Sequence, residues 1–576
     1  MNPPIHGVLA LLLAWLVIFP AICGLGFFTQ CALEGKGAGS GRRGSGAGLP
    51  TLFWLGWAAL LLALPTLHLV AKIDGRVTFP LLALGYLGFG RRCWRRVGPD
   101  FRQTWTELAV ALPGLVWIAA HAVLAPAVHD SGLYHFAAIR WAQEYPVVPG
   151  LGLLHGRLAF NQSFFLYGAF LNAPPLTARG FHVANSLPFA VLFLQLIAGV
   201  RKLFVRRRAS ADLWFCALLL PAVAVQGSAW FRGHPISSPT PDLALFTIGV
   251  VLAMHLATLA RCPALARRQR VRLHLILLLA AAGVMTKLSF AGAAVAFVAG
   301  AAWFGWRSGW IAADRRALGM VAVATLGWMA HGVVTSGYPL YPSALGGLPV
   351  EWRIAPEAVG KMAAAIKGWA RQPGIDWPAS LDSWHWLGAW MGRVFREPET
   401  VLVLLFGALA VGAFLAARVP SFRSRACAGP ARWLLVPIFP GVAGLVFWFV
   451  TAPDPRFLGA PPLAAAAWCC AVGWWRWRAV IDGRWPALGA GLVTCLLMAP
   501  KHDDAPGSKF DAFGWGKPPK VRLISKATDS GVAIQLPESG QLVWDGKLPS
   551  TPYFEPRLEL RGAKLRHGFK LRDATE

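Results

Sequence analysis

Charged side chains are scarce in this sequence. They account for 14% of its 576 residues, and the 27 acidic residues are outnumbered by 55 lysines and arginines. Hydrophobic residues account for 56%, and 28 residues are tryptophan. A soluble protein of this length does not combine so few charges with so many apolar runs of helix-spanning length. The composition therefore predicts a polytopic, all-α membrane protein, with tryptophans concentrated at the membrane surfaces.

Other signals are missing as well. The nine cysteines form no CxxC pair and no spacing typical of a secreted disulfide framework. No repeat of fixed period is present. The first apolar run has no basic segment before it and no small-residue cleavage site, so we expect a span rather than a signal peptide. The net charge of +28 is spread between apolar runs, which indicates basic cytoplasmic loops and no nucleic-acid partner.

Apolar runs predict about 13 transmembrane helices. Their approximate ranges are 7–29, 50–71, 104–127, 182–200, 211–229, 241–260, 271–286, 288–305, 317–336, 399–417, 432–451, 457–475 and 485–500. If the arginine-rich segments between them face the cytoplasm, the spans alternate without conflict from residue 104 onward. Before that point, the short run Phe79 to Gly90 fits a span or a half-buried cytoplasmic helix, and we favour the second.

This topology divides the chain into six parts. They are N-terminal spans with a basic cytoplasmic loop (1–127), a first long periplasmic loop (128–181), core spans (182–336), a second long periplasmic loop (337–398), C-terminal spans (399–500) and a periplasmic cap (501–576). We expect an amphipathic helix near Pro356 to Arg371, and short strands at Val532 to Leu536 and Leu558 to Leu560.

Polar interruptions far apart in the sequence fall on one predicted side. They are the loop 128–181, the turn 230–242, the break Thr286 to Ser289 and the segment Thr451 to Phe457. Ionisable groups near hydrocarbon are costly, so their default interpretation is a functional cavity.

The most informative segment is His129-Asp130-Ser131-Gly132-Leu133-Tyr134-His135. A shielded carboxylate at a cavity mouth can take a proton from an acceptor hydroxyl, so Asp130 is the candidate catalytic base. The alternative is that Asp130 caps a helix beginning at Ser131. Two histidines and one acid make a weak metal signal without a further ligand, so we assign no metal site and no cofactor, while the pattern leaves room for a divalent ion.

Three cations are candidate phosphate ligands: Arg157, Lys287 and Arg456. Lys287 lies between two apolar runs, and its alternative role is an ion pair with Asp242, Asp454 or Asp130. Arg456 has a local alternative in Asp454, and Asp242 fits ordinary helix capping as well as substrate binding. We assign the remaining polar residues of these segments to substrate binding: His129, Tyr134, His135, His155, Asn161, His234 and Asp242. The tryptophans of residues 352–390 fit either stacking on a sugar or prenyl chain, or an interfacial belt.

These residues resemble the GT-C superfamily of integral-membrane glycosyltransferases, in which an acidic residue of the first long extracytoplasmic loop is characteristic. Asp130 matches in type and place, although three of the predicted spans precede it here rather than one. More closely, the chain resembles a bacterial family of uncharacterised multi-spanning proteins. The shared patterns are D-x-G-x-Y-H (Asp130 to His135), VPGLGxLHGRLxFN (Val148 to Asn161), SSPxPD (Ser237 to Asp242), KLS (Lys287 to Ser289), DPRF (Asp454 to Phe457) and TPYFxPxLxLRG (Thr551 to Gly562).

The resemblance implies an inner-membrane enzyme of the bacterial cell envelope. It would transfer a sugar, with inversion, from a polyprenyl-phosphate donor to a glycan or lipid acceptor on the periplasmic face, and membrane lipids would be its other partners. Two further functions stay open on the residues alone. One is a transporter or flippase for lipid-linked saccharides, and the other is a non-catalytic assembly subunit.

Overall fold

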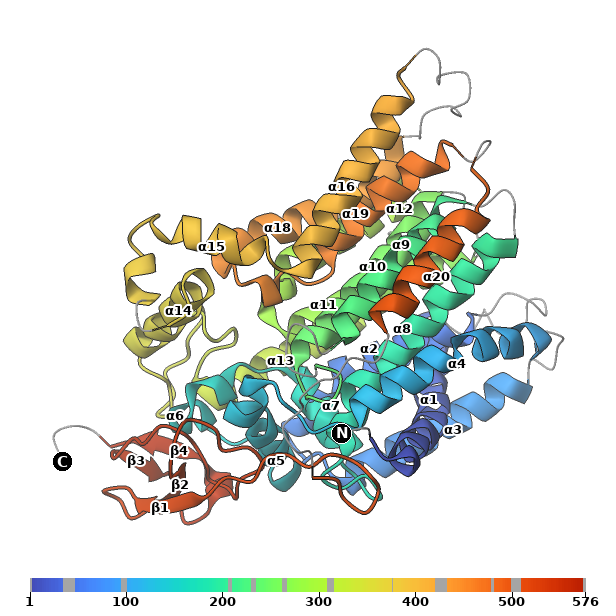
Figure 1. Ribbon diagram of the computed structural model, residues 1–576. Coiled ribbons are helices and arrows are strands. Elements are labelled where there is room, and N and C mark those ends of the chain that lie inside the picture. The colour runs from blue at the N-terminus through green and yellow to red at the C-terminus, as the bar shows by residue number, and fades with distance from the viewer. Residues whose placement is uncertain are drawn as a thin grey trace.

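The computed structural model describes residues 3–34, 47–94, 101–205, 210–228, 235–261, 267–307, 315–374, 377–419, 432–477, 481–498 and 509–572. The described chain is mostly helical (Figure 1). Its main helices are α1 (Ile5–Glu34), α2 (Leu49–His68), α3 (Gly75–Trp94), α4 (Phe101–Ala122), α5 (Phe136–Glu144), α6 (Leu151–Leu154), α7 (Ser163–Leu171), α8 (Gly180–Val205), α9 (Ala211–Gly227), α10 (Pro241–Arg261), α11 (Arg267–Thr286), α12 (Ala291–Arg307), α13 (Arg315–Ser336), α14 (Pro356–Arg371), α15 (Trp386–Val394), α16 (Pro398–Ala416), α18 (Phe439–Thr451), α19 (Pro461–Trp475) and α20 (Arg484–Leu497).

Nine helical segments of the described chain are long and apolar enough to cross a membrane. They correspond to α1, α2, α8, α10, most of α11, α12, α13, α16 and α18. The apolar part of α4, together with α9 and α20, is shorter. Thirteen spans are predicted from the sequence, and part of the difference lies at α19. This helix begins at Pro461 rather than near residue 457 and has 15 residues, because a proline pair opens it.

The first three helices pack unusually closely. A Cβ atom added to Gly24 of α1 would lie 1.6 Å from the carbonyl oxygen of Gly85 in α3. One added to Gly56 of α2 would lie 1.9 Å from the carbonyl oxygen of Ile22. Such contacts bring two backbones together where no larger residue fits. The segment around Phe79 to Gly90 is thus part of a 20-residue helix that packs along α1.

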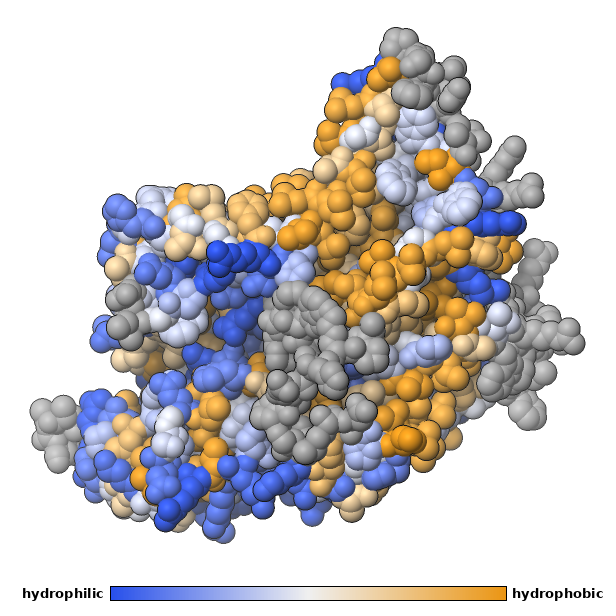
Figure 2. All heavy atoms as spheres, viewed as in Figure 1, coloured by the Kyte–Doolittle hydropathy of each residue, from blue (hydrophilic) through white to orange (hydrophobic). Residues whose placement is uncertain are grey.

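The surface separates by hydropathy. Hydrophobic side chains cover the long helices in the view of Figure 2, and hydrophilic ones cover the lobes at the end that carries α5, α14 and the strands. Exposed leucines and valines occur along α1, α16, α18 and α20. Soluble monomers rarely expose continuous apolar surface on this scale.

The polar end combines three parts of the sequence. The α5–α6 region, the α14–α15 region and the C-terminal strands all lie at this end of the long helices (Figure 1). Helix α14 has the predicted bounds, Pro356–Arg371. Two antiparallel pairs, β1 (Leu523–Ala527) with β2 (Ala533–Pro537) and β3 (Leu558–Leu560) with β4 (Phe569–Leu571), confirm a small β-rich segment near the C-terminus.

This C-terminal segment donates hydrogen bonds to main-chain carbonyls of the helical part at four places. The Trp515 indole donates to the Gly7 carbonyl (2.8 Å), and the Gly516 amide donates to the Val123 carbonyl (2.7 Å). The amides of Val543 and Trp544 both donate to the Gly132 carbonyl, at 2.9 and 2.8 Å. The Phe569 amide donates to the Pro149 carbonyl, at 2.9 Å. The segment therefore contacts the turn that follows Asp130 directly.

Candidate functional site

Asp130 lies at the start of a helical segment that contains a π-helical turn. His129 and Asp130 are followed by the π turn η2 (Ser131–His135), which continues into α5. Single π turns occur often at functional sites. The Asp130 side chain makes no capping hydrogen bond to this helix, so the structure does not support the helix-cap alternative.

The Asp130 carboxylate instead binds two arginines. Its Oδ1 accepts a hydrogen bond from Nη1 of Arg157 and its Oδ2 accepts one from Nη1 of Arg456, both at 3.1 Å. Arg157 comes from the 3₁₀ turn η3 (Gly156–Ala159), and Arg456 comes from the 3₁₀ turn η8 (Pro455–Phe457). The carboxylate is 18% exposed and each guanidinium side chain 34%, so the cluster is partly shielded and still reachable from solvent.

These contacts determine the acidity of Asp130. Burial alone would raise the pKa of this carboxyl, but the nearby His129 and the charges of Arg456 and Arg157 hold it well below its usual range. The pKa of Arg456 is raised despite burial, because Asp130 and Asp454 favour its charged form. In this arrangement Asp130 is an ionised, fully engaged carboxylate and a weak base.

A second ion pair lies beside the first. Lys287 precedes the 3₁₀ turn η4 (Leu288–Phe290), which connects α11 to α12, and its Nζ lies 2.5 Å from Oδ1 of Asp242 in the first turn of α10. Lys287 therefore forms one of the ion pairs named as alternatives to phosphate binding, the pair with Asp242. The Phe457 ring lies under both Lys287 (4.0 Å) and Arg456 (4.8 Å) and joins the two pairs through cation–π contacts.

Two tryptophans hold the segment that carries Arg456. The Trp390 indole donates to the Pro453 carbonyl at 2.5 Å, and the Trp448 indole donates to the Asp454 carbonyl at 2.7 Å. Asp454 accepts the Arg456 amide at 3.0 Å and lies 3.6 Å from its guanidinium, so the predicted local pair also forms. Trp390 thus has a structural role, whereas Trp369 and Trp384 are exposed.

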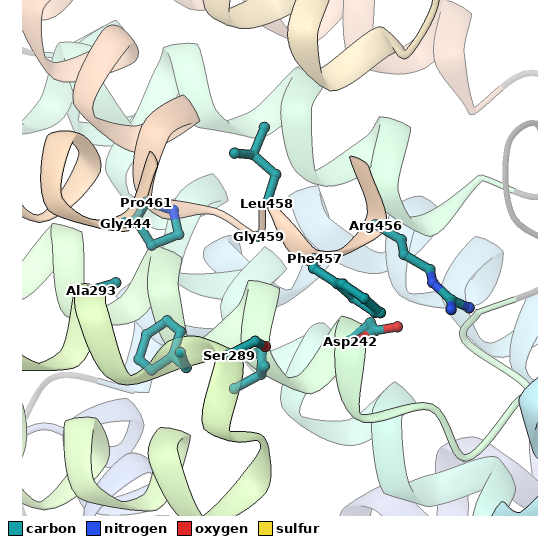
Figure 3. Close-up of a pocket in the computed structure, with 11 residues that line it drawn as sticks. Asp242, Ser289, Ala293, Gly444, Arg456, Phe457, Leu458, Gly459 and Pro461 are labelled. Atoms are coloured by element: carbon teal, nitrogen blue, oxygen red, sulfur yellow. The ribbon is translucent and has the colours of Figure 1, made fainter. Parts of the chain in front are cut away.

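A pocket adjoins the two ion pairs (Figure 3). Its lining residues are Asp242, Leu245, Ser289, Phe290, Ala293, Gly444, Arg456, Phe457, Leu458, Gly459 and Pro461. Asp242, Phe457 and Arg456 lie together at one end, whereas Ala293, Gly444 and Pro461 lie at the other. The apolar end is bounded by α12 and α18, both candidate membrane spans. The pocket is therefore amphiphilic, with its charged end next to Asp130.

Aromatic rings surround the other side of the cluster. The Arg157 guanidinium lies 5.8 Å from the centre of the Tyr134 ring, which packs against His135 and His155. Burial raises the pKa of Tyr134 and lowers the pKa of His135 to about 3. Burial, with the charge of Arg157, also lowers the pKa of His155 to about 3. These three groups are therefore neutral at pH 7.

Tyr553 is a neighbour of the site that the sequence-based assignment did not include. Its ring lies 5.2 Å from the ring of His155, whose buried Nε2 has no hydrogen-bond partner in the described part of the chain. Tyr553 belongs to the pattern TPYF quoted in the sequence analysis, and this pattern was the one sequence feature that could have pointed to it. The C-terminal segment thus reaches the edge of the cluster.

Three other residues that were assigned to substrate binding from the sequence are Asn161, His129 and His234. The Asn161 amide donates to the Trp328 carbonyl (2.6 Å) and the Trp328 indole donates back to the Asn161 carbonyl (2.7 Å), a structural bridge. His129 is largely exposed, with its Nδ1 3.9 Å from Asp130 Oδ1. His234 lies outside the described residues.

The segment Ser237 to Asp242 supports the site through hydrogen bonds, a role that was not predicted from the sequence. The Ser238 hydroxyl accepts the amides of Ala127 and Val128, at 3.2 and 3.3 Å. The buried Asn185 amide donates to the carbonyls of Ser238 (2.8 Å) and Thr240 (2.9 Å). The same short loop therefore holds the residues just before Asp130 and leads into the first turn of α10, which contains Asp242.

The cluster contains equal numbers of acidic and basic side chains. Three carboxylates (Asp130, Asp242 and Asp454) balance three permanent cations (Arg157, Lys287 and Arg456). The described residues contain no group of three His, Cys, Asp or Glu side chains that could hold a metal ion. Arg456 lines the pocket, and Arg157 and Lys287 are joined to it through their contacts with Asp130 and Asp242. Arginine and lysine side chains can bind a phosphate, and a carboxylate can take a proton.

The comparisons with known proteins give a family and no function. No curated protein matches the chain, and no solved structure matches it. One family model matches residues 8–460, a range that contains all six charged residues of the cluster and ends before the C-terminal segment. The chain belongs to the family described as a domain of unknown function, DUF8201.

Proposed function

We propose that this protein is a multi-pass glycosyltransferase of the GT-C type in a bacterial inner membrane. It would transfer a sugar from a polyprenyl-phosphate donor to a glycan or lipid acceptor on the periplasmic face. The observation that carries the proposal is the contact of Asp130 with Arg157 and Arg456 beside an amphiphilic pocket. That arrangement supports the proposal, because a carboxylate and two arginines lie together at the polar end of apolar helices.

In this proposal the charged residues would bind the phosphate of the donor and the apolar end of the pocket would bind its prenyl chain. Arg456 and Lys287, with Arg157, would bind the phosphate and stabilise the charge that it gains as leaving group. The apolar end of the pocket, between α12 and α18, would take the first units of the prenyl chain. Asp130 would orient the acceptor hydroxyl and accept its proton. Attack opposite the phosphate would invert the anomeric carbon.

Asp130→Asn tests the assignment of the base. The substitution keeps the size of the side chain and some hydrogen bonding, but an amide cannot accept the proton. We expect transfer to fall by about a hundredfold to ten-thousandfold, the usual contribution of a general base. The assay uses the purified full-length chain with a panel of polyprenyl-phosphate sugars and measures formation of the new glycosidic bond.

Asp511→Asn is the matched control for this assay. Asp511 also forms an ion pair with an arginine, Arg179, but it belongs to the C-terminal segment and not to the cluster. Its substitution should leave transfer within about twofold of the unmodified chain. Transfer that survives in the Asp130→Asn variant would remove Asp130 from the catalytic role, whatever the other residues bind.

The transporter alternative depends on a broken membrane helix. Lys287 lies in a short turn between α11 and α12, which pack against each other as neighbours, so the interruption is a connection between two helices. Vesicles that contain the protein test this alternative. Movement of a lipid-linked saccharide across the bilayer, without a new glycosidic bond, would favour it over the transferase.

A further inference from the structure

Every cation of the cluster is already engaged by a carboxylate of the same chain. Asp130 uses both oxygens, one on Nη1 of Arg157 and the other on Nη1 of Arg456. Lys287 contacts Asp242 at 2.5 Å. The groups proposed to bind phosphate are therefore not vacant, and an incoming anion meets a closed set of ion pairs.

Charge balance decides how such an anion would bind. The cluster has three negative and three positive groups, so a phosphate added to it without other change would leave the site with excess negative charge. Partly buried like charges a few ångströms apart repel strongly. Each guanidinium has five N–H donors, and a phosphate bound at this position competes with Asp130 for the two Nη1 groups that hold the carboxylate. Exchange of one anion for the other avoids the competition for these donors, and the released carboxylate loses its negative charge when it accepts a proton.

We propose that a phosphate-bearing lipid binds by ion-pair exchange, its phosphate taking the Nη1 donors of Arg157 and Arg456 from Asp130, and that only the released carboxylate acts as base. The base then stays inactive until the donor is in place. Premature deprotonation of water is thereby avoided. The role of Asp130 as base rests on the proposed function, whereas the competition for the arginines does not.

Transfer of the sugar then requires no further reactant. The acceptor O–H gives its proton to the released Asp130 carboxylate, and the acceptor oxygen forms a bond to the anomeric carbon. The bond between that carbon and the phosphate oxygen breaks, and its electron pair leaves with the phosphate. Arg157 and Arg456 already contact the phosphate in this arrangement, so they stabilise the leaving group without moving again.

The surroundings of Asp130 support a large change in its basicity on exchange. Its pKa is held low chiefly by His129, Arg456 and Arg157 acting against burial. A phosphate that takes over the contacts of both arginines would weaken that effect and add a negative charge. The ionisable groups around Asp130 are His129, Tyr134, His135, Arg157, Asp242, Lys287, Asp454 and Arg456.

The test measures binding rather than activity. Farnesyl monophosphate is titrated by calorimetry into the full-length chain in nanodiscs, with farnesol and inorganic phosphate as separate ligands. Asp130→Asn removes the internal competitor, so it should bind farnesyl monophosphate about tenfold more tightly, a factor expected for one charged hydrogen-bonding competitor. Farnesol should bind both chains equally. Asp130→Glu restores the charge and should return the affinity toward that of the unmodified chain, and Asp511→Asn should leave it unchanged.

The outcomes separate this inference from the proposed function. Equal or weaker binding of farnesyl monophosphate by Asp130→Asn overturns the exchange. Tighter binding of inorganic phosphate alone overturns the lipid source of the anion. Tighter binding together with no glycosyl transfer to any acceptor supports the exchange while the transferase proposal fails. If Asp130→Asn does not accumulate as a folded protein, Asp130→Ser provides the same neutral substitution.

Discussion

Lys287 and Asp242 form an ion pair that bears on stability and on the proposed binding of phosphate. The two residues are 45 positions apart, and the Lys287 side chain is only 17% exposed. Removal of one member leaves a shielded charge without its partner, which costs more than removal of both. The effects of the pair on folding and on ligand binding can therefore be separated by single and double substitutions.

Lys287→Met should lower stability by about 1–3 kcal/mol, because Asp242 is left uncompensated in a partly shielded place. The double variant Lys287→Met with Asp242→Asn should recover most of that loss. Its affinity for farnesyl monophosphate should stay reduced, because the positive charge is still missing. Thermal unfolding and calorimetry measure the two quantities. A double variant with restored affinity would show that Lys287 only compensates Asp242.

His155 should make the protein sensitive to acid. Burial and Arg157 lower its pKa from 6.5 to about 3 in the folded protein, whereas the unfolded chain has the ordinary value. The unfolded state therefore binds the proton first, and stability falls as the pH decreases from about 6.5 toward about 3. His155→Gln should flatten the dependence of the melting temperature on pH in this window. An unchanged pH profile in the variant would show that His155 is protonated without cost.

At the scale of secondary-structure elements, hydropathy and proline positions predicted some segments closely. Pro356 and the amphipathic period predicted the bounds of α14. The alternation of apolar and polar residues predicted the ends of β2 and β3 to within one residue. The π turn at Ser131–His135 could not be predicted, because one extra residue per turn leaves no periodic signal over five residues. The late start of α19 was also missed, since Asp454 to Phe457 forms a separate turn that aims Arg456 at Asp130.

Gly132→Ala should loosen the contact between this π turn and the C-terminal segment. The added Cβ would lie 2.6 Å from the Trp544 indole, while Trp544 already has a positive φ of 45° and little freedom to shift. We expect a loss of about 1–3 kcal/mol, as for other overpacked sites, and faster proteolysis of the C-terminal segment.

The matched control is Gly360→Ala in α14. Nothing lies within 4 Å of its added Cβ, so the substitution should stabilise the helix slightly. Proteolysis of Gly132→Ala at the rate of the unmodified chain would mean that Trp544 moves aside easily and does not hold the turn.

At the scale of the whole molecule, the charge pattern predicted which segments share a side but not which residues touch. Asp130 and Arg456 are 326 positions apart, and a topology derived from loop charges places both at one surface without fixing their contact. The pairing depends on packing among helices, on the Trp390 and Trp448 hydrogen bonds and on the loop at Ser238. None of these has a local sequence signature.

Reporter fusions test the orientation of the whole chain in its membrane. Fusions after Val205 and Arg418 should read cytoplasmic, because both follow candidate spans at the ends rich in arginine. Fusions after Gln372 and Gly540 should read periplasmic, since both belong to the polar end that carries the cluster. A cytoplasmic reading at Gln372 would place Asp130 on the wrong side for a periplasmic donor.

The four attachments of the C-terminal segment also bear on how the protein is made. Residues 509–572 leave the ribosome after every helix, yet they bind positions as early as Gly7 and contact Gly132 and His155 beside the cluster. During synthesis the helices must therefore assemble while the surfaces at Val123, Gly132 and Pro149 are still uncovered. A nascent protein therefore carries the six charged residues of the cluster before it has the contacts that the C-terminal segment makes with Gly132 and His155.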